Sequence, residues 1–410
     1  MNKRYFVILF LFSFVYGDSL KDLLESANVQ NNIIISKELS SKAKLKEYEA
    51  SRSAMFPTLD VGGFFQSVDD KTLMQPGDIY SGYVKLSYSI YDGGRKSSIK
   101  KQKLEELKST KFEADAFKKS LVLQIVQDFF NIKNTKAMIN SLKEKQIALK
   151  AQLKRVKKFY DVNLSTKDDV NKLQSAYDMN SYNIQSLKLQ KTTLLKQLEL
   201  KVGKSINSLE DSRFLKNLNI KLELTDEIKA LKAKRKSLKY LAKSIESANL
   251  PQVNITDTYS KYNYDRYDKL HPKGLDEQNK IMLSVNLRLF DDGMISKNKQ
   301  SAILNVKALE NQIIYKTKEQ KMLFNIAKSR IKTLKAKIKS AKSALKSALS
   351  TYKTIKSKYE ARLVDNVAYL DALSVKTEAK SRYESSLNEL EIAYAIFYYY
   401  AGKDPKEFIK

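Results

Sequence analysis

The stretch VKLSYSIYDGGR, residues 84–95, decides the fold because two periodicities meet in it. Its first half alternates apolar and polar residues, which predicts a strand with one apolar face. An Asp-Gly motif ends the alternation, and a helical pattern follows. The stretch LSVNLRLFDDG, residues 283–293, repeats this arrangement, with Phe290 at an offset of 199 residues from Tyr91. We expect both motifs to be strand-to-helix junctions, formed by Asp92, Gly93 and Gly94 and by Asp291, Asp292 and Gly293.

Two further motifs recur at the same offset and indicate a gene duplication. Tyr160 corresponds to Tyr359, and Gly203 corresponds to Gly402. The predicted organisation is a first repeat at 18–203, a polar linker at 204–225 and a second repeat at 226–410. Each repeat is expected to hold one β-hairpin, at about 57–92 and at about 251–291.

Long helices are predicted downstream of each junction. Apolar residues from Phe324 to Tyr359 are spaced alternately by three and four, which is a heptad seam, and the register persists from Ile125 to Tyr160. A helix of about 65 residues is nearly 100 Å long and must pack along its length. Shorter helices are expected at about 20–56, 165–202, 226–249 and 365–401. We expect two short helices to stack end to end beside each long one.

The predicted strands are about ten residues long, which suits the tilted strands of an outer-membrane barrel. A small sheet packed against its own helices is the alternative. Four strands cannot close a barrel, and open edges in lipid leave backbone groups without partners. On the membrane interpretation the chain must therefore form a homo-oligomer.

The N-terminal residues predict a secretory signal peptide at 1–17. A basic head is followed by an apolar stretch from Tyr5 to Val15, with cleavage expected before Asp18; an uncleaved anchor is the alternative. The chain has no cysteine, and its single histidine, His271, precedes a proline in a polar loop. These features leave little basis for a metal site, a cofactor or histidine-dependent catalysis.

The formal net charge of +29 raises the question of nucleic-acid binding. The lysines fall singly between apolar residues, which is typical of a solvated helix face: Lys332, Lys335, Lys337, Lys339 and Lys342. No recognition motif accompanies them. We therefore expect no nucleic-acid partner.

The duplicated layout resembles the TolC-type family of outer-membrane efflux and secretion channels. The residues that carry the resemblance are the two junctions and the two turns, Tyr160 to Val170 and Tyr359 to Asp371. The resemblance implies a mainly helical fold with membrane strands, in which a homotrimer forms one 12-stranded β-barrel continued by a coiled-coil helical barrel. It also implies a periplasmic adaptor protein and an inner-membrane transporter as partners. The implied location is the outer membrane of a Gram-negative cell, extending into the periplasm.

The same resemblance assigns roles at the turns. Leu164 and Leu363, with Asn163 and Arg362, occupy the adaptor-contact turns. The family usually has glycine where Asn163 and Arg362 stand, and arginine tolerates the left-handed conformation less well than asparagine. The gate residues implied are Asp169, paired with Tyr359, and Asp371, at one position of an acidic constriction. Two other gate positions of the family are Val364 and Ala368 here.

Several motifs have a structural explanation beside the functional one. Residues 93–97, GGRKS, faintly resemble a phosphate loop but lack its spacing, so a junction role is preferred. Acids in the turns cap helices or act at a pore entrance, and both explanations stay open. Tyrosines of the second hairpin suit an interfacial girdle or a plain surface loop: Tyr259, Tyr262, Tyr264 and Tyr267.

The function that fits these observations is a passive exit duct, gated at its periplasmic end, of a tripartite efflux pump or a type I secretion system. A structural or adhesive coiled-coil surface protein without channel activity is the alternative. An enzyme is disfavoured because no nucleophile–base pair or ligand set can be assembled from the sequence.

Overall fold

The computed structural model describes residues 18–70, 72, 75–266 and 274–410. The signal peptide predicted at 1–17, His271 and Tyr267 lie outside these residues. The chain divides into two compact units. The turn unit comprises the residues up to 36, 115–225 and 318–410, and the sheet unit comprises residues 37–114 and 226–317.

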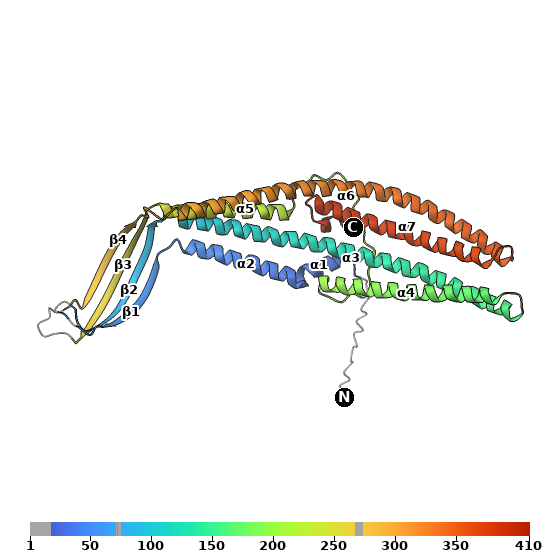
Figure 1. Ribbon diagram of the computed structural model, residues 1–410, viewed down its shortest axis with the longest axis horizontal. Helices are drawn as coiled ribbons and strands as arrows, with labels where there is room; N and C mark the ends of the chain where they lie inside the picture. Colours follow the sequence, from blue (N-terminus) through green and yellow to red (C-terminus); the bar gives the residue numbers. More distant parts are fainter. Residues whose placement is uncertain (1–17, 71, 73–74, 267–273) are drawn as a thin grey trace, which may run out of the picture. The chain divides into compact units, whose positions relative to one another are not determined.

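Helices make up most of the chain, and four strands form one sheet (Figure 1). The helices are α1 (Leu20–Gln30), α2 (Asn32–Ser53), α3 (Arg95–Asp161), α4 (Lys167–Val202), α5 (Asp226–Glu246), α6 (Met294–Glu360) and α7 (Asn366–Tyr400), with short 3-10 helices η1 (Ser247–Asn249) and η2 (Pro405–Phe408). The strands are β1 (Thr58–Ser67), β2 (Asp78–Tyr91), β3 (Gln252–Asp265) and β4 (Glu277–Asn286). The predicted class, mainly helical with a small sheet in a duplicated order, is confirmed.

The two long helices are α3 and α6, each of 67 residues. Their heptad seams are the buried faces in the turn unit. In α6 the seam residues Ile331 and Leu334 are buried, and in α3 the equivalent Ile132 is buried. Towards the turns, a second cluster joins the seams of α3 and α6 to α4 and α7 through Leu149, Val156, Leu173, Tyr369 and Leu373.

The helix expected at 20–56 is two helices, because Asn31 interrupts it in an extended conformation. The Asn31 side chain donates from Nδ2 to the carbonyl of Lys201 at 2.8 Å and accepts from the backbone N–H of Ile33 at 2.9 Å. Asn31 therefore caps the N-terminus of α2 and also gives a carbonyl group in the last turn of α4 a hydrogen-bond donor. At this point the short helices meet end to end, as expected. Gly203 ends α4 with φ 83°, and an added Cβ there would lie 2.7 Å from Gln30.

The tract 204–225 is more than a polar connection. Ile206 and Phe214 are buried in the main core of the turn unit. The backbone N–H of Phe214 donates to the carboxylate of Glu391 in α7 at 2.7 Å, and the Phe214 ring lies 6.2 Å from that of Tyr398. These contacts tie the tract to α7.

In the sheet unit the strands pair antiparallel in the order β1-β2-β3-β4. One face carries an apolar row whose members are largely exposed, including Leu59, Val61, Leu86, Leu283 and Val285. Neither buried core contains a residue of the sheet. The sheet is therefore not part of either hydrophobic cluster, both of which lie in the turn unit.

Strand β4 is shorter than the sequence pattern predicts. The alternation continues to Leu289, but the ladder ends where Asn286 pairs with Gln252. Pro251 precedes Gln252, and proline has no N–H to donate to a ladder, so pairing stops there. None of the helices in the described residues is long and apolar enough to cross a membrane.

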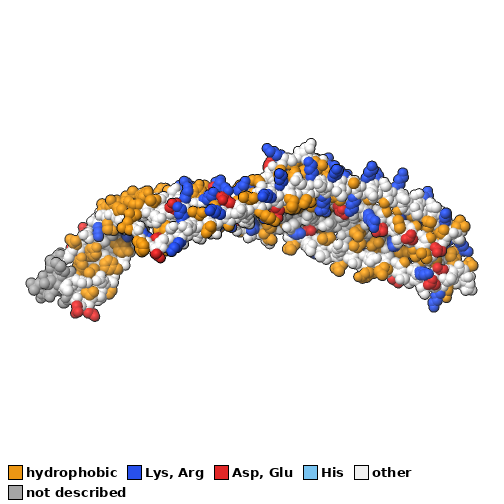
Figure 2. Space-filling view, turned by 45° about the horizontal axis from the view of Figure 1, so that its top comes forward, with side chains coloured by type: hydrophobic (Ala, Val, Ile, Leu, Met, Phe, Trp, Pro, Cys, Tyr) orange, Lys and Arg blue, Asp and Glu red, His pale blue; other side chains and the backbone are white. Residues whose placement is uncertain are grey.

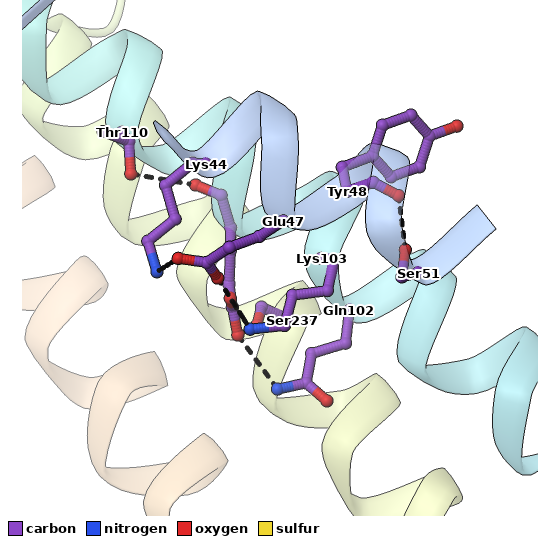
Figure 3. Close-up of polar contacts among 9 residues, drawn as sticks. Lys44, Glu47, Tyr48, Ser51, Gln102, Lys103, Thr110 and Ser237 are labelled. Carbon is purple, nitrogen blue, oxygen red and sulfur yellow. Dashed lines mark hydrogen bonds and ion pairs between the residues drawn. The ribbon is translucent and has the colours of Figure 1, made fainter. Parts of the chain in front are cut away.

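An ion-pair network joins the helices of the sheet unit (Figure 3). The Glu47 carboxylate of α2 accepts from Lys44 and from Lys103 of α3, both at 2.8 Å. Lys103 also pairs with Glu106 at 3.2 Å, and Glu106 accepts from the Ser237 hydroxyl of α5 at 3.3 Å. Polar and charged groups thus cross-link α2, α3 and α5.

Candidate functional site

The two Asp-Gly motifs form the same local structure at the entry to each long helix. The Asp92 carboxylate accepts from the backbone N–H of Gly94 at 3.0 Å and of Lys96 at 2.6 Å. Asp291 accepts in the same way from Gly293 and Ile295, both at 3.0 Å. Each aspartate therefore satisfies free N–H groups of the first helical turn.

Backbone conformation explains the glycines at the junctions. Gly93, Gly94 and Gly293 have φ of 65°, 80° and 73°, and Asp292 is left-handed with φ 52°. An added Cβ at Gly93 would lie 2.7 Å from the carbonyl oxygen of Ser247. These observations account for the GGRKS segment without a bound phosphate.

The turns at the other end of the two long helices have the same pattern of backbone hydrogen bonds. Leu164 donates to the carbonyl of Phe159 at 2.7 Å, and Asn163 donates to that of Tyr160 at 3.0 Å. Leu363 donates to Lys358 at 2.9 Å, and Arg362 donates to Tyr359 at 3.0 Å. This is the paired hydrogen-bond pattern of a Schellman cap.

The left-handed residues of these caps are Asn163, with φ 59°, and Arg362, with φ 61°. The cap leaves a leucine projecting at each tip: the side chain of Leu164 is 60% exposed and that of Leu363 is 74% exposed. Exposed apolar side chains at a tip are suited to contact with another molecule.

The side chain of Arg362, although exposed, stacks on an aromatic ring at the end of α3. Its guanidinium lies 4.7 Å from the ring centroid of Phe159, and that of Arg155 lies 5.3 Å from the same centroid. Arg155 also donates to the carbonyl of Glu360 at 3.2 Å. The ring of Phe159 thus joins the α6–α7 turn to α3 through its cation–π contact with Arg362, while Arg155, itself in α3, stacks on the same ring.

The helices after each turn begin with side-chain caps. Asp169 and Thr166 form a capping box, in which the Asp169 carboxylate accepts from the Thr166 hydroxyl at 2.9 Å. This hydrogen bond lowers the pKa of Asp169 below its ordinary value. Asp365 accepts from the N–H of Ala368 at 2.9 Å, and Asp168 pairs with Lys172 at 2.6 Å. Capping is therefore a role these acids fill.

Tyr359 lies at the centre of an aromatic and polar cluster. Its hydroxyl accepts from the Gln152 side chain at 2.5 Å, and its ring stacks on Tyr369 with centroids 5.0 Å apart. Burial raises the pKa of the Tyr359 hydroxyl. Tyr359 and Asp169 both line one cavity of about 200 Å³. Among the described residues, however, the hydrogen bonds of the two run to Gln152 and to the α4 cap, so their pairing stays a prediction.

Asp371 lies apart from this cavity, exposed on the first turns of α7. It lines a groove of about 410 Å³ between α6 and α7, whose other members include Ala344, Ser347, Thr351 and Val375. The structure thus brings Asp169 and Tyr359 together and leaves Asp371 in a separate groove.

Sequence reasoning missed Gln152, Arg155 and Phe159. Each of the three directly precedes a seam position of α3, so they lie together on one flank of the seam. Gln152 is only 7% exposed although it is outside the seam, because it meets the α6–α7 coil. The sequence held a signal for them, because their residue types are not repeated at the offset of 199. The equivalent positions of the second repeat are Thr351, Thr354 and Lys358.

Comparison with known proteins places this fold among those of known families. The sequence model of the family described as outer membrane efflux protein matches residues 23–204. The predicted resemblance to TolC-type outer-membrane efflux channels is thereby confirmed, through the first repeat in sequence and nearly the whole chain in fold. No curated protein matches the sequence.

Solved structures with this fold include a membrane protein from Pseudomonas aeruginosa, with a TM-score of 0.84, 15% identity and 93% of each chain covered. The Campylobacter jejuni CmeC outer membrane channel has a TM-score of 0.84 and 17% identity, over 95% of this chain and 86% of that one. The Vibrio cholerae outer membrane protein VceC has a TM-score of 0.82 and 13% identity, over 94% and 96%. The proteins of the matched family are transport conduits and not enzymes.

Proposed function

We propose that this chain is an outer-membrane exit duct, assembled as a homotrimer and coupled to a periplasmic adaptor and an inner-membrane transporter. The transporter belongs to a tripartite efflux pump or a type I secretion system. The observation that carries the proposal is the open sheet. β1 pairs only with β2, and β4 pairs only with β3 among the described strands, while the apolar row is exposed.

Closing this sheet requires other copies of the chain. Each unsatisfied backbone group costs several kcal/mol in lipid, so the edges β1 and β4 need partners there. A barrel of eight strands is the smallest usual size, which excludes a single chain. Three copies supply twelve strands, the number that the family resemblance implies.

A second support comes from the duplication. The flank of α3 beside its seam is filled within the subunit: Lys145 donates to Ser374 at 2.8 Å, and Asn134 accepts from Asn388 at 2.7 Å, both in α7. The equivalent flank of α6 carries mostly small, exposed residues, among them Thr333 and Ala344, although its Lys337 pairs with Glu389 of α7 at 2.7 Å. We infer that a helix of another copy covers this flank, and by the duplication that helix is α4.

The offset of 199 residues specifies which residues meet. By this offset, Asn134 of α3 corresponds to Thr333 of α6, and Asn388 of α7 corresponds to Leu189 of α4. We therefore expect Thr333 of one copy to lie beside Leu189 of the next. Leu189 is 71% exposed in the single chain. Its large apolar side chain faces a flank of small residues in this arrangement, which is a favourable packing combination.

The experiment is disulfide trapping of the variant Leu189→Cys/Thr333→Cys in detergent, since the chain has no cysteine of its own. We expect covalent dimers and trimers and no larger species. A matched control is Leu189→Cys/Lys332→Cys, whose second thiol is moved to the adjacent face and is expected to cross-link poorly. A monomeric particle by mass measurement, or equal trapping in both variants, would contradict the arrangement.

We further propose roles at the turns. Leu164 and Leu363, with the left-handed Asn163 and Arg362 that project them, contact the adaptor. Asp371 of each copy supplies a ring of carboxylates at the entrance, which attracts cations. Tyr359 and Asp169 hold the closed state.

A further inference from the structure

Helix α6 has three distinct faces between residues 328 and 356. The first is the apolar seam. The second is a flank made mostly of serine, threonine and alanine, which also holds Arg330 and Lys337. The third is a row of exposed lysines, each one residue beyond a seam position: Lys328, Lys332, Lys335, Lys339, Lys342, Lys346, Lys353 and Lys356. One position of the row is the apolar Leu349, and no acidic residue occurs between Glu319 and Glu360.

The row is regular. Successive positions of the row, three or four residues apart, rise about 5 Å along the axis, and the whole row is about 40 Å long. Blue side chains extend along the visible face of the helices with fewer red ones among them (Figure 2). A surface that only kept the protein soluble would mix both signs of charge.

Helix α3 carries the same row at equivalent positions. Its exposed members are Lys136, Lys143, Lys150, Lys154 and Lys157. Four of these are lysine again at the offset of 199, as Lys335, Lys342, Lys353 and Lys356. The lysine face therefore belongs to both long helices, whereas the flank on the other side of the seam differs between them.

The direction of the face follows from packing. Seam and flank residues point about 100° apart around a heptad helix. The seam of α3 faces α4 and its flank faces α7, as the contacts of Lys145 and Asn134 establish. In a closed ring of helices, the directions from one helix to its two neighbours enclose an angle that is on average less than 180° on the side of the lumen. The lysine face points away from both neighbours, into the wider angle, and therefore lies on the outside of the ring.

The chemistry of the face restricts its partner. Lysine is depleted in the cores of protein–protein interfaces, and its ammonium is a strongly hydrated point charge. A row of such charges with a single apolar residue is unsuited to a packed helix. It is suited to a flexible linear polymer with repeated anionic groups.

We propose that the lysine faces of α3 and α6 bind the carboxylate-bearing glycan–peptide polymer of the cell wall. This inference rests on the proposed function, because an outer-membrane duct that extends into the periplasm meets that polymer. The ammonium groups contact its carboxylates along the outside of the helical barrel. The contact anchors the duct laterally and leaves its lumen unaffected.

The test is co-sedimentation of the full-length assembly in detergent with isolated insoluble wall sacculi, at about 0.05 M salt and again at about 0.5 M salt. The variant is K332Q/K335Q/K339Q/K342Q/K346Q. The matched control is K42Q/K188Q/K234Q/K307Q/K318Q. It removes the same charge from exposed lysines of α2, α4 and α5 and from the part of α6 that precedes the row. Sacculi with amidated carboxylates are the ligand control.

We expect binding by the first variant to weaken about tenfold or more, and binding by the control to change less than about twofold. High salt and amidation should each remove binding by the unmodified protein. The pairs K332Q/K335Q and K342Q/K346Q should give graded losses, and they replace the fivefold variant if it fails to assemble.

Equal losses in the two fivefold variants, or no loss in either, would overturn the inference. So would unchanged wall binding with altered ion selectivity in planar bilayers, because the face would then line the lumen. An unmodified protein that binds sacculi but never conducts would instead contradict the proposed duct.

Discussion

Arg362 occupies a backbone conformation that favours glycine, and substitutions there separate two opposing effects. The residue is left-handed, with φ 61°, and its guanidinium lies 4.7 Å from the Phe159 ring centroid. The conformation costs a non-glycine residue about 1–2 kcal/mol. The cation–π contact contributes about 0.5–1 kcal/mol at an exposed site. The contact thus offsets a part of the backbone cost.

The two effects predict different outcomes for two variants. Arg362→Ala keeps the backbone cost and loses the contact, so local opening of the turn should rise about two- to fivefold. Arg362→Gly loses the same contact but also relieves the strain, so the turn should be protected as well as, or better than, in the unmodified protein. Asn163→Gly is the matched control, because it relieves strain at the equivalent turn without removing a stack.

Hydrogen exchange of the assembled channel, followed by mass spectrometry on peptides spanning 357–366, measures this opening. The amide of Leu363 is the informative group, since it donates to Lys358 within the cap. Equal protection in Arg362→Ala and the unmodified protein would refute the role of the stack. Lower protection in Arg362→Gly than in Arg362→Ala would refute the account of the strain.

Three further outcomes are expected. Because the Thr166 hydrogen bond lowers the pKa of Asp169, its capping contribution is complete above the ordinary carboxyl pKa and is lost as pH falls through the lower, folded value. The protection of the first-turn amides of α4, measured relative to their intrinsic exchange rates, should therefore stay constant from about pH 7 to 5 and fall only below about pH 4. Tyr359→Phe removes the hydroxyl that accepts from Gln152, so open probability in planar bilayers should rise, whereas an unchanged value would place closure elsewhere. Asp371→Ala should weaken cation preference and block by multivalent cations, and unchanged selectivity would remove it from the entrance.

The sequence predicted the fold well where one periodicity dominates. The 3,4 spacing from Phe324 to Tyr359 specified a helix that ends within one residue of the expected turn, at Glu360. Prediction was poorer where a single polar side chain decides. Asn31 ends one helix and caps the next through a bond to Lys201, a residue distant in sequence. Such a break has no periodic signature.

The candidate site was predictable only in part. The Asp-Gly junctions were inferred from local sequence, because each depends on a few neighbouring residues. The turns at Asn163 and Arg362 were inferred from the family resemblance, in which glycine usually stands at these positions. The stack on Phe159 and the bond from Gln152 to Tyr359 were not, since they join helices of different repeats. Adjacent helices must be placed before such contacts can be named.

The duplication also explains why the two turns of one chain are not interchangeable. In α3 the flank residues Gln152 and Arg155 form polar contacts with the second coil of the same chain. The equivalent residues of α6, Thr351 and Thr354, cannot form them. In the proposed trimeric ring, polar contacts within subunits would therefore alternate with contacts of mostly small residues between subunits. Separation at the first type would leave the buried Gln152 side chain without its partner, so opening should occur at the second type.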